Sequence, residues 1–297
     1  MKSTQSLWCT QSLWSCVGLV AALFAMQAGG SGAATAGALD KIRTDQTVRL
    51  AYREDAPPFS YKEPNSGEPT GYMVNLCRGV AKKLGEQLGI SSLKMTYVPV
   101  TAANRFDVIE KQGADLLCGA SSITVSRRAH VDFSIPTFID GASLLTTDKS
   151  IEDFKALAGK RIGVLAGTTT EEGLREALKA AGVSAEVVPV KTHAEGVGML
   201  DGGQVTAYFA DRSILLYLAQ DSKAPKNLFI SSQYLSIEVY ALALPRGDED
   251  FRLAVDTALS RIYRSGEINT IFTQSLGDKA KLNDLIIALY KMWSLPD

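Results

Sequence analysis

Arginine and hydroxyl side chains follow two of the apolar runs in this sequence, and such groups bind carboxylates. Arg53 stands at the exit of the first run, ahead of a loop stiffened by Pro57 and Pro58. Ligands of α/β proteins gather at the carboxyl ends of strands, so Arg53 is a candidate binding residue. A surface ion pair between Arg53 and Glu54 or Asp55 is the alternative interpretation.

The segment from Gly119 to Arg128 (GASSITVSRR) is the second candidate, directly after a short apolar run. Its hydroxyl and backbone N–H groups are able to donate hydrogen bonds to an anion. Arg127 adds a guanidinium, which binds a carboxylate through two parallel hydrogen bonds. The alternative is a polar loop with an exposed arginine, and the spacing alone leaves both interpretations open.

The segment 167–172 (GTTTEE) lies between an apolar run and an amphipathic stretch. The free N–H groups at a helix N-terminus favour a bound anion. The same residues also predict a capping box, with Thr168 or Thr169 as N-cap and Glu171 or Glu172 closing it. The two interpretations are compatible with each other.

A carboxylate and a histidine complete the set of candidate groups. Asp211 ends the apolar run 205–210, where it is placed either to receive an ammonium group or to cap a helix over 212–220. His193 titrates near neutrality, and without further context we expect a solvent-facing loop residue. His193 and His130 stand apart, and no Cys/His cluster has zinc spacing, so we expect no metal site.

Short β-rich runs alternate with amphipathic segments from about residue 47, which is typical of α/β proteins with mostly parallel sheets. The apolar residues of 72–88 and 168–181 repeat with helical spacing. The expected strands are Val48–Tyr52, Lys94–Val100, Asp115–Gly119, Lys160–Ala166, Glu186–Lys191, Val205–Ala210 and Val239–Leu244, and further helices are expected over 249–264, 266–275 and 278–294.

The order of these elements predicts two lobes. A fresh βαβ pattern begins at Lys160 after a polar stretch, and the final helices are too few for a domain of their own. We therefore expect the last segment to return to the first lobe, which gives two hinge crossings and a ligand cleft between the lobes. The expected bounds are 37–145 plus 239–297 for lobe 1 and 146–238 for lobe 2.

Residues 1–36 are typical of a secretory signal peptide. They carry one charge, Lys2, then the apolar run Leu13–Met26, and they end in Ala34-Thr35-Ala36, an A-x-A cleavage pattern. A membrane span needs about 20 apolar residues, and this run is shorter. We therefore expect export to the periplasm as a soluble protein.

The charge of the chain excludes nucleic acid and anionic membranes as partners. The chain of 297 residues has 31 Lys+Arg against 32 Asp+Glu, and a net charge of −1 is too small to hold nucleic acid or an anionic membrane. Hydrophobic residues make up 46%, close to the globular average. Without the signal peptide the chain keeps Cys77 and Cys118, which permit one disulfide in an oxidising compartment.

Taken in order, several segments between about residues 46 and 276 resemble the periplasmic amino-acid-binding proteins of ABC transporters, the family 3 solute-binding proteins. These segments are VRLAYREDAPPFSYKE, Gly71-Tyr72, NRFDVIEKQGADLLCGASSITVSRRAHVDFS, LAGKRIGVLAGTTTEEGL, VTAYFAD and ALSRIYRSGEINTIF. The resemblance implies the type II periplasmic-binding-protein fold. It also implies a monomer without a cofactor that passes an amino acid to an inner-membrane ABC permease.

The resemblance assigns the two ends of the ligand backbone. The positions that match those holding the ligand α-carboxylate are Arg127, Ser122, Thr124, Thr168 and Thr169. Asp211 matches the acceptor of the α-ammonium group. Some family members also carry cysteines at places similar to Cys77 and Cys118, so the resemblance implies a disulfide, with two buried thiols as the alternative.

Arg53, Asn104-Arg105 and His193 resemble the glutamate/aspartate subgroup, in which Arg and His close around the side-chain carboxylate. Alanine stands at 102, 103 and 120, near positions where that subgroup commonly has a hydroxyl residue. The choice among glutamate, aspartate, their amides and other dicarboxylates therefore stays open.

The charges agree with an acidic ligand. A doubly carboxylated amino acid has one ammonium group, and Arg53, Arg105 and Arg127 against Asp211 complement that pattern. A buried unpaired charge is costly, so three arginines should discriminate against neutral or cationic ligands. We expect a non-catalytic receptor whose lobes close around glutamate or aspartate.

Two other classes of protein compete with this expectation. Periplasmic cyclohexadienyl dehydratases share the fold and use the cleft for an acid-assisted elimination, in which His193 or a nearby glutamate would donate the proton. A sensor input domain normally adjoins a membrane span and a signalling module, and the sequence to Asp297 shows neither. Binding of another polar amino acid is a further alternative.

Overall fold

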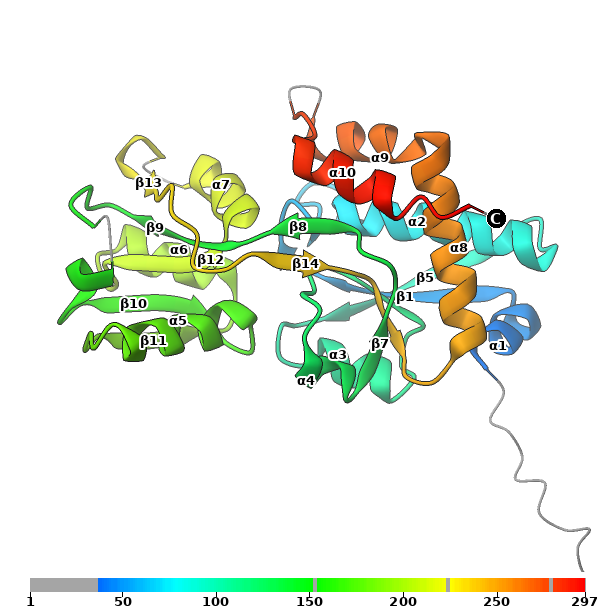
Figure 1. Ribbon diagram of the computed structural model, residues 1–297, viewed down its shortest axis with the longest axis horizontal. Coiled ribbons are helices and arrows are strands. Elements are labelled where there is room, and N and C mark those ends of the chain that lie inside the picture. The colour runs from blue at the N-terminus through cyan, green and yellow to red at the C-terminus, as the bar shows by residue number, and fades with distance from the viewer. Residues whose placement is uncertain (1–36, 152–153, 223–224, 278–279, 297) are drawn as a thin grey trace, which may run out of the picture. The chain divides into compact units, whose positions relative to one another are not determined.

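The computed structural model describes residues 37–151, 154–222, 225–277 and 280–296. The predicted signal peptide, residues 1–36, lies outside the described residues. Residues 37–297 form one compact unit with two sheet-containing lobes, so the predicted α/β, two-lobed architecture is confirmed (Figure 1).

Lobe 1 is built on a sheet of strand order β5-β1-β6-β15-β7. The strands are β1 (Thr47–Arg53), β5 (Lys94–Val100), β6 (Leu116–Cys118), β7 (Val131–Phe133) and β15 (Ala243–Pro245). Both β5 and β6 run parallel to β1, so the carboxyl ends of these three strands meet at one edge of the sheet. That edge places Arg53, at the end of β1, beside the loop that follows β6.

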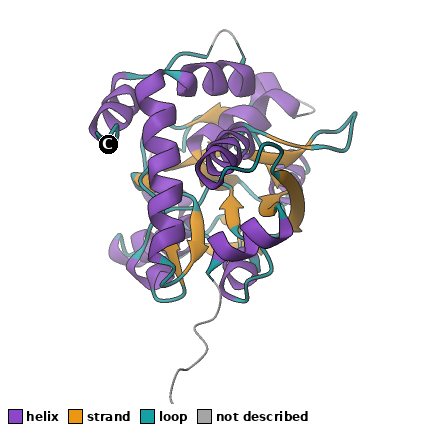
Figure 2. Cartoon of the chain, turned by 90° about the vertical axis from the view of Figure 1, so that its right-hand side faces the viewer, coloured by secondary structure: helices purple, strands orange, loops and turns teal. Residues whose placement is uncertain are grey.

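Helices surround the strands of this lobe (Figure 2). They are α1 (Ala38–Asp45), α2 (Tyr72–Leu88), α3 (Arg105–Glu110), α4 (Val125–Arg128), α8 (Glu249–Ser265), α9 (Glu267–Leu276) and α10 (Asp284–Met292). The predicted helix over 72–88 is confirmed, and its apolar face packs on α8 and α9. The helix expected over 278–294 begins only at Asp284, because Asn283 caps it by accepting a hydrogen bond from the Ile286 N–H at 2.9 Å.

A small sheet of β2 (Asp55–Ala56), β3 (Ser60–Lys62) and β4 (Pro69–Thr70) folds the loop after β1 back on the lobe. Gly71 joins this sheet to α2 with φ +112°, and a Cβ there would lie 2.5 Å from the Phe59 carbonyl oxygen. Only glycine fits this close approach. The small sheet therefore holds Asp55 in a fixed place two residues beyond Arg53.

Lobe 2 has a sheet of strand order β11-β10-β12-β9-β13. Its strands are β9 (Ala142–Thr146), β10 (Arg161–Leu165), β11 (Glu186–Val190), β12 (Ala207–Asp211) and β13 (Phe229–Ile230). Its helices are α5 (Thr169–Ala180), α6 (His193–Asp201) and α7 (Arg212–Asp221). Short 3-10 turns lie at Phe154–Leu157 and Pro225–Asn227. The first strand of this sheet starts at Ala142, four residues before the expected boundary at 146. The division of the chain into lobes by residue number stays a prediction.

Two chain segments cross between the lobes as the paired strands β8 (Phe138–Asp140) and β14 (Glu238–Tyr240) (Figure 1). They run antiparallel, with Glu238 opposite Asp140. The single strand expected over Val239–Leu244 is wrong, because β14 pairs with β8 in the crossing whereas the next strand, β15, pairs in the sheet of lobe 1.

A disulfide joins Cys77 of α2 to Cys118 of β6, so the pairing implied by the family resemblance is confirmed. The two residues are separated by 41 positions, and a cross-link over a loop of that length stabilises the folded state by about 4 kcal/mol in the chain-entropy treatment. Both side chains are buried in the core of lobe 1.

We expect the double variant Cys77→Ala/Cys118→Ala to lose about 2–4 kcal/mol of unfolding free energy, because its unfolded chain is no longer constrained. Urea denaturation, followed by circular dichroism, measures this loss. Wild-type protein treated with reductant before unfolding serves as control and should match the variant. An unchanged denaturation midpoint would contradict the structural role of the disulfide.

Candidate functional site

Eight of the nine side chains predicted to bind a ligand line one pocket of about 390 Å³. Its walls come from the ends of β1, β10 and β12 and from the first turns of α3, α5 and α6, so both lobes contribute. The predicted residues in the wall are Arg53, Arg105, Ser122, Arg127, Thr168, Thr169, His193 and Asp211. Thr124 is not among the lining residues, and its hydroxyl caps α4 by accepting a hydrogen bond from the Arg127 N–H at 3.1 Å.

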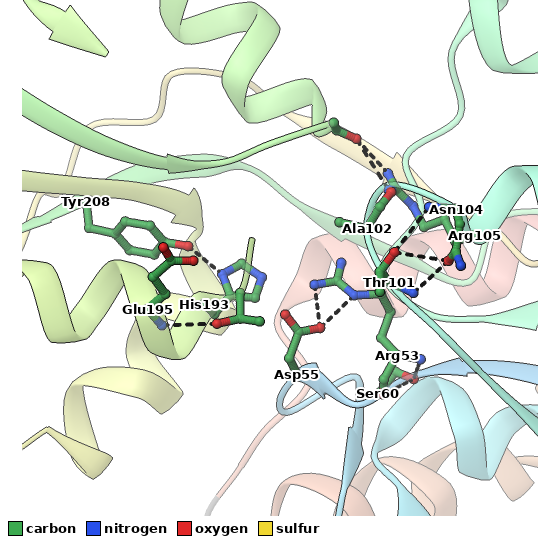
Figure 3. Close-up of polar contacts among 12 residues, drawn as sticks. Arg53, Asp55, Ser60, Thr101, Ala102, Asn104, Arg105, His193, Glu195 and Tyr208 are labelled. Atoms are coloured by element: carbon green, nitrogen blue, oxygen red, sulfur yellow. Dashed lines mark hydrogen bonds and ion pairs between the residues drawn. The ribbon is translucent and has the colours of Figure 1, made fainter. Parts of the chain in front are cut away.

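Arg53 is the last residue of β1 and is only 4% exposed. Its Nε donates a hydrogen bond to Asp55 Oδ1 at 2.8 Å. Its Nη2 lies 2.6 Å from the same oxygen but lacks the alignment of a hydrogen bond. The ion pair that we raised as the alternative for Arg53 is therefore present, but it is buried beside the pocket and not on the surface (Figure 3).

Arg105 begins α3 and is 3% exposed. Its guanidinium donates to the carbonyl oxygens of Ala102 and Gly167, the latter at 3.3 Å, while its Nε has no hydrogen-bond partner among the described residues. Burial, and then the nearby positive charges of Arg127 and Arg53, hold the pKa of Arg105 well below its ordinary value. Because carbonyl dipoles do not neutralise a buried cation, an anion in the pocket would stabilise this side chain.

Arg127 and Arg105 both contact the ring of Phe106. Its guanidinium carbon is 4.9 Å from the centre of the Phe106 ring, and that of Arg105 is 4.5 Å from the same ring. The Nη1 of Arg127 also donates to the Ser122 carbonyl oxygen at 2.8 Å. Phe106 thus orients two cations through contact with its face, a role that the sequence analysis did not assign.

Glu238 of β14 connects hydroxyl groups from both lobes. Its Oε2 accepts hydrogen bonds from the hydroxyls of Ser122 in lobe 1 and of Thr169 in lobe 2, the latter at 2.6 Å. Its Oε1 accepts a third from Ser236 Oγ at 2.9 Å. A hydroxyl has one hydrogen, and in Ser122 and Thr169 it is donated to Glu238. Towards any other group, these two hydroxyl oxygens therefore act only as hydrogen-bond acceptors. Glu238 was not among the site residues predicted from the sequence.

The first turn of α5 confirms the predicted cap. Thr168 accepts a hydrogen bond from the Glu171 N–H at 3.2 Å, and the Glu171 carboxylate reaches back to the Gly167 N–H at 3.0 Å. Because Thr168 also donates to the Leu165 carbonyl oxygen at 2.7 Å, its hydroxyl hydrogen is already used. The backbone N–H groups at the start of α5 remain as donors towards the pocket.

Asp211 ends β12 and precedes α7, but its side chain makes no capping hydrogen bond. Its Oδ1 instead accepts a hydrogen bond from the buried Thr170 hydroxyl at 3.2 Å. Burial and the nearby carboxylates of Glu238 and Asp140 raise the pKa of Asp211 to about 7, against the hydrogen bonds that lower it. Burial likewise raises the pKa of Asp140 to about 6. A positive charge beside Asp211 would relieve this repulsion.

A pH-dependent stability difference follows from the raised pKa of Asp211. The folded state takes up a proton as pH falls through about 7, whereas the unfolded chain does so only near pH 4. The destabilisation by the charged form is therefore complete above about pH 7, shrinks as pH falls, and vanishes only below about pH 4. We expect Asp211→Asn to be more stable than the wild type by about 1–3 kcal/mol at pH 8, with the difference shrinking at pH 5. Urea denaturation of ligand-free protein at both pH values measures it, and equal differences at both would contradict the assignment.

His193 begins α6 and is 3% exposed, so the solvent-facing loop expected without context is wrong. Its Nδ1 is 2.8 Å from the hydroxyl of Tyr208 on β12 (Figure 3). Burial and then the charge of Arg53 lower the pKa of His193 to about 3, which leaves the ring neutral near pH 7. His193 therefore offers the pocket a hydrogen bond and no charge.

The pocket is suited to hold a small zwitterion with an extra negative charge. Three guanidinium groups lie on its lobe 1 side, and one carboxylate with oxygen acceptors lies towards lobe 2. Within the described ranges, no group of three or more His, Cys, Asp and Glu side chains is placed to bind a metal ion. No described helix is long and apolar enough to cross a membrane.

This fold and pocket define a solute-binding protein, and the chain belongs to the bacterial extracellular solute-binding proteins, family 3, whose model matches residues 48–278. It is 32% identical to an L-glutamate/L-aspartate-binding protein of Pseudomonas aeruginosa over 248 residues, 82% of each chain. It is 27% identical to a glutamate/aspartate import solute-binding protein of Escherichia coli, over 89% of this chain and 91% of the other.

A solved structure shares the architecture. It is an ancestral amino-acid-binding protein, a precursor of cyclohexadienyl dehydratase, which superposes with a TM-score of 0.69 and 25% sequence identity. The match covers 80% of this chain and 99% of that one. The type II binding-protein fold implied by the sequence is thereby confirmed.

Proposed function

We propose that this protein is a periplasmic receptor that binds glutamate or aspartate between its lobes and delivers it to an inner-membrane ABC permease. The observation that supports this most strongly is the convergence of Arg53, Arg105 and Arg127, from separate stretches of chain, on one pocket with Asp211 in its wall. The names of the two relatives above agree with an acidic amino acid. The proposed export signal, residues 1–36, agrees with the extracellular family.

The ligand's backbone groups are proposed to bind at two places. Arg127 and the N–H groups at the start of α5 hold the α-carboxylate, because a guanidinium and a helix N-terminus both favour an anion. Asp211 accepts the α-ammonium group, together with Ser122 and Thr169, whose lone pairs face outward from Glu238. This gives Ser122 and Thr169 an accepting role, in place of the carboxylate-binding role that the resemblance implies.

The side-chain carboxylate is proposed to bind on the Arg105 side of the pocket, with Arg53 and His193 around it. Among the described residues Arg105 forms no ion pair and its Nε has no hydrogen-bond partner, so a carboxylate there would supply an anion in direct contact with the guanidinium. Closure of the two lobes then follows from the higher affinity of the closed form for ligand.

An enzyme of the dehydratase type is the second candidate, favoured by the solved precursor with the same fold. Such an elimination needs a proton donor above the ligand. His193 is a poor acid near pH 7, because its pKa is lowered to about 3 and its Nδ1 is engaged by Tyr208. We therefore expect no aromatic product when the protein is incubated with prephenate or arogenate.

A thermal-shift screen of purified protein against the standard amino acids tests the proposed function. Ligand bound to the folded state alone raises the melting temperature, by an amount that grows with ligand concentration above the dissociation constant. Glutamate and aspartate should give the largest rise, and arginine and lysine should give none. A larger rise with a cationic amino acid than with glutamate would refute the proposal.

A further inference from the structure

Asp55 is a second carboxylate at the proposed side-chain end of the pocket. It lies in β2, two residues beyond Arg53, and its side chain is 22% exposed. Figure 3 shows it between Arg53 of lobe 1 and His193 of lobe 2, with its Oδ1 directed at the Arg53 guanidinium. The small sheet of β2, β3 and β4 holds it there, so this contact is built into the fold.

Because of this contact, the charges of Arg53 and Arg105 are neutralised to different extents. Arg53 already has an anion, because Nε donates to Asp55 at 2.8 Å and Nη2 is 2.6 Å from the same oxygen. Arg105 has only carbonyl oxygens as acceptors among the described residues, and its Nε has none. The neutral His193 adds no charge. One of the two guanidinium charges is therefore cancelled before any ligand arrives.

We infer that Asp55 is a specificity-determining residue, which weakens the preference of the pocket for a side-chain carboxylate over a side-chain amide. The inference rests on the proposed function. A ligand carboxylate that approaches Arg53 also approaches the Asp55 carboxylate, and like charges at short range repel. An amide avoids this repulsion, and its NH₂ group is able to donate a hydrogen bond to Asp55. Asp55 thus narrows the difference in affinity between glutamate and glutamine.

The variant Asp55→Asn tests this role, because the amide keeps an oxygen acceptor for Arg53 Nε and removes the charge. We expect its affinity for glutamate to rise about tenfold, which corresponds to about 1.4 kcal/mol, while its affinity for glutamine stays the same or falls. Titration calorimetry with both ligands gives the ratio of the two dissociation constants. A merely structural role would change both affinities together and leave the ratio as it is. Asp55→Ser should change the ratio in the same direction.

Glu54→Gln is the matched control, since it neutralises the neighbouring carboxylate of the same loop. In the part of the chain that the structure describes, Glu54 contacts Lys62 and Tyr52 and forms no ion pair with Arg53, so its substitution should leave the glutamate-to-glutamine ratio unchanged. If the wild type binds glutamate but Asp55→Asn leaves the ratio unchanged or lowers it, the role of Asp55 is refuted and the proposed function stands. If the wild type binds neither acidic amino acids nor their amides, both are refuted.

Discussion

Substitution of Arg127 by alanine should lower the affinity for every amino acid that the protein binds, by about 100-fold or more. The α-carboxylate is common to all amino acids, and the loss of a two-pronged, charge-assisted contact costs about 3 kcal/mol or more. Arg127 is also fixed in place before binding, by the Ser122 carbonyl oxygen and the Phe106 ring, so little ordering of this side chain opposes its contact with the ligand. Titration calorimetry with glutamate, aspartate and glutamine measures the loss.

Arg128→Ala is the control for this variant. Arg128 is the next residue of α4, is exposed and lies over the Phe133 ring at 6.0 Å, outside the lining of the pocket. Its removal should leave all dissociation constants within about twofold of the wild type, as is usual for an exposed surface substitution. An Arg127→Ala protein that keeps wild-type affinity for any of the three ligands would contradict the assignment of the α-carboxylate.

Substitution of Arg53 by alanine should remove the preference for acidic ligands. The variant loses one guanidinium and leaves the Asp55 carboxylate unpaired beside the pocket, where it repels a ligand carboxylate. We expect glutamate to bind about 100-fold more weakly and glutamine to change far less, so that the two affinities approach or cross each other. Competition of both amino acids for the same protein sample measures the ratio.

The double variant Arg53→Ala/Asp55→Asn separates the two causes of this loss. With the repelling carboxylate neutralised, it should regain part of the glutamate affinity, and the recovered part measures the coupling between Arg53 and Asp55. Unchanged glutamate affinity in Arg53→Ala alone would contradict the proposed ligand, whatever the double variant shows.

The local patterns of the chain predicted most of the lobe architecture. The runs at 48–52, 94–100 and 186–191 became strands within one or two residues of their expected ends. The first lies inside the sheet of lobe 1 and is largely buried, whereas the other two pair at the edges of their sheets and are only partly covered. The arginine at the exit of β1 faces the pocket for the same reason, since parallel strands place their carboxyl ends together. The resemblance to a family supplied the pairing of the cysteines.

The positions of Glu238 and Asp55 at the site depend on long-range packing, which the local sequence patterns do not show. Glu238 reaches Ser122 and Thr169 only because β14 pairs with β8 in the crossing between lobes. No residue spacing in the sequence predicts that pairing. Asp55 was considered as a surface partner of Arg53, yet the fold buries Arg53 and turns the pair towards the second lobe.

His193 is different, because a local signal was present. The residues Thr192 and Glu195 have the spacing of a capping box, and Thr192 accepts a hydrogen bond from the Glu195 N–H at 3.1 Å. That capping pattern predicts a helix that begins at His193. It would have corrected our prediction that His193 lies in a solvent-facing loop. The burial of the ring against Tyr208 comes from the tertiary fold and required the structure.

The proposed binding mode is best tested by a crystal structure of the protein with bound L-glutamate. It should show one glutamate in the pocket, with one carboxylate on Arg127, the other on the Arg105 side, and the ammonium group on Asp211. Glutamate bound elsewhere, or held in this pocket without contact to any of the three guanidinium groups, would show that these arginines do not neutralise a doubly carboxylated amino acid.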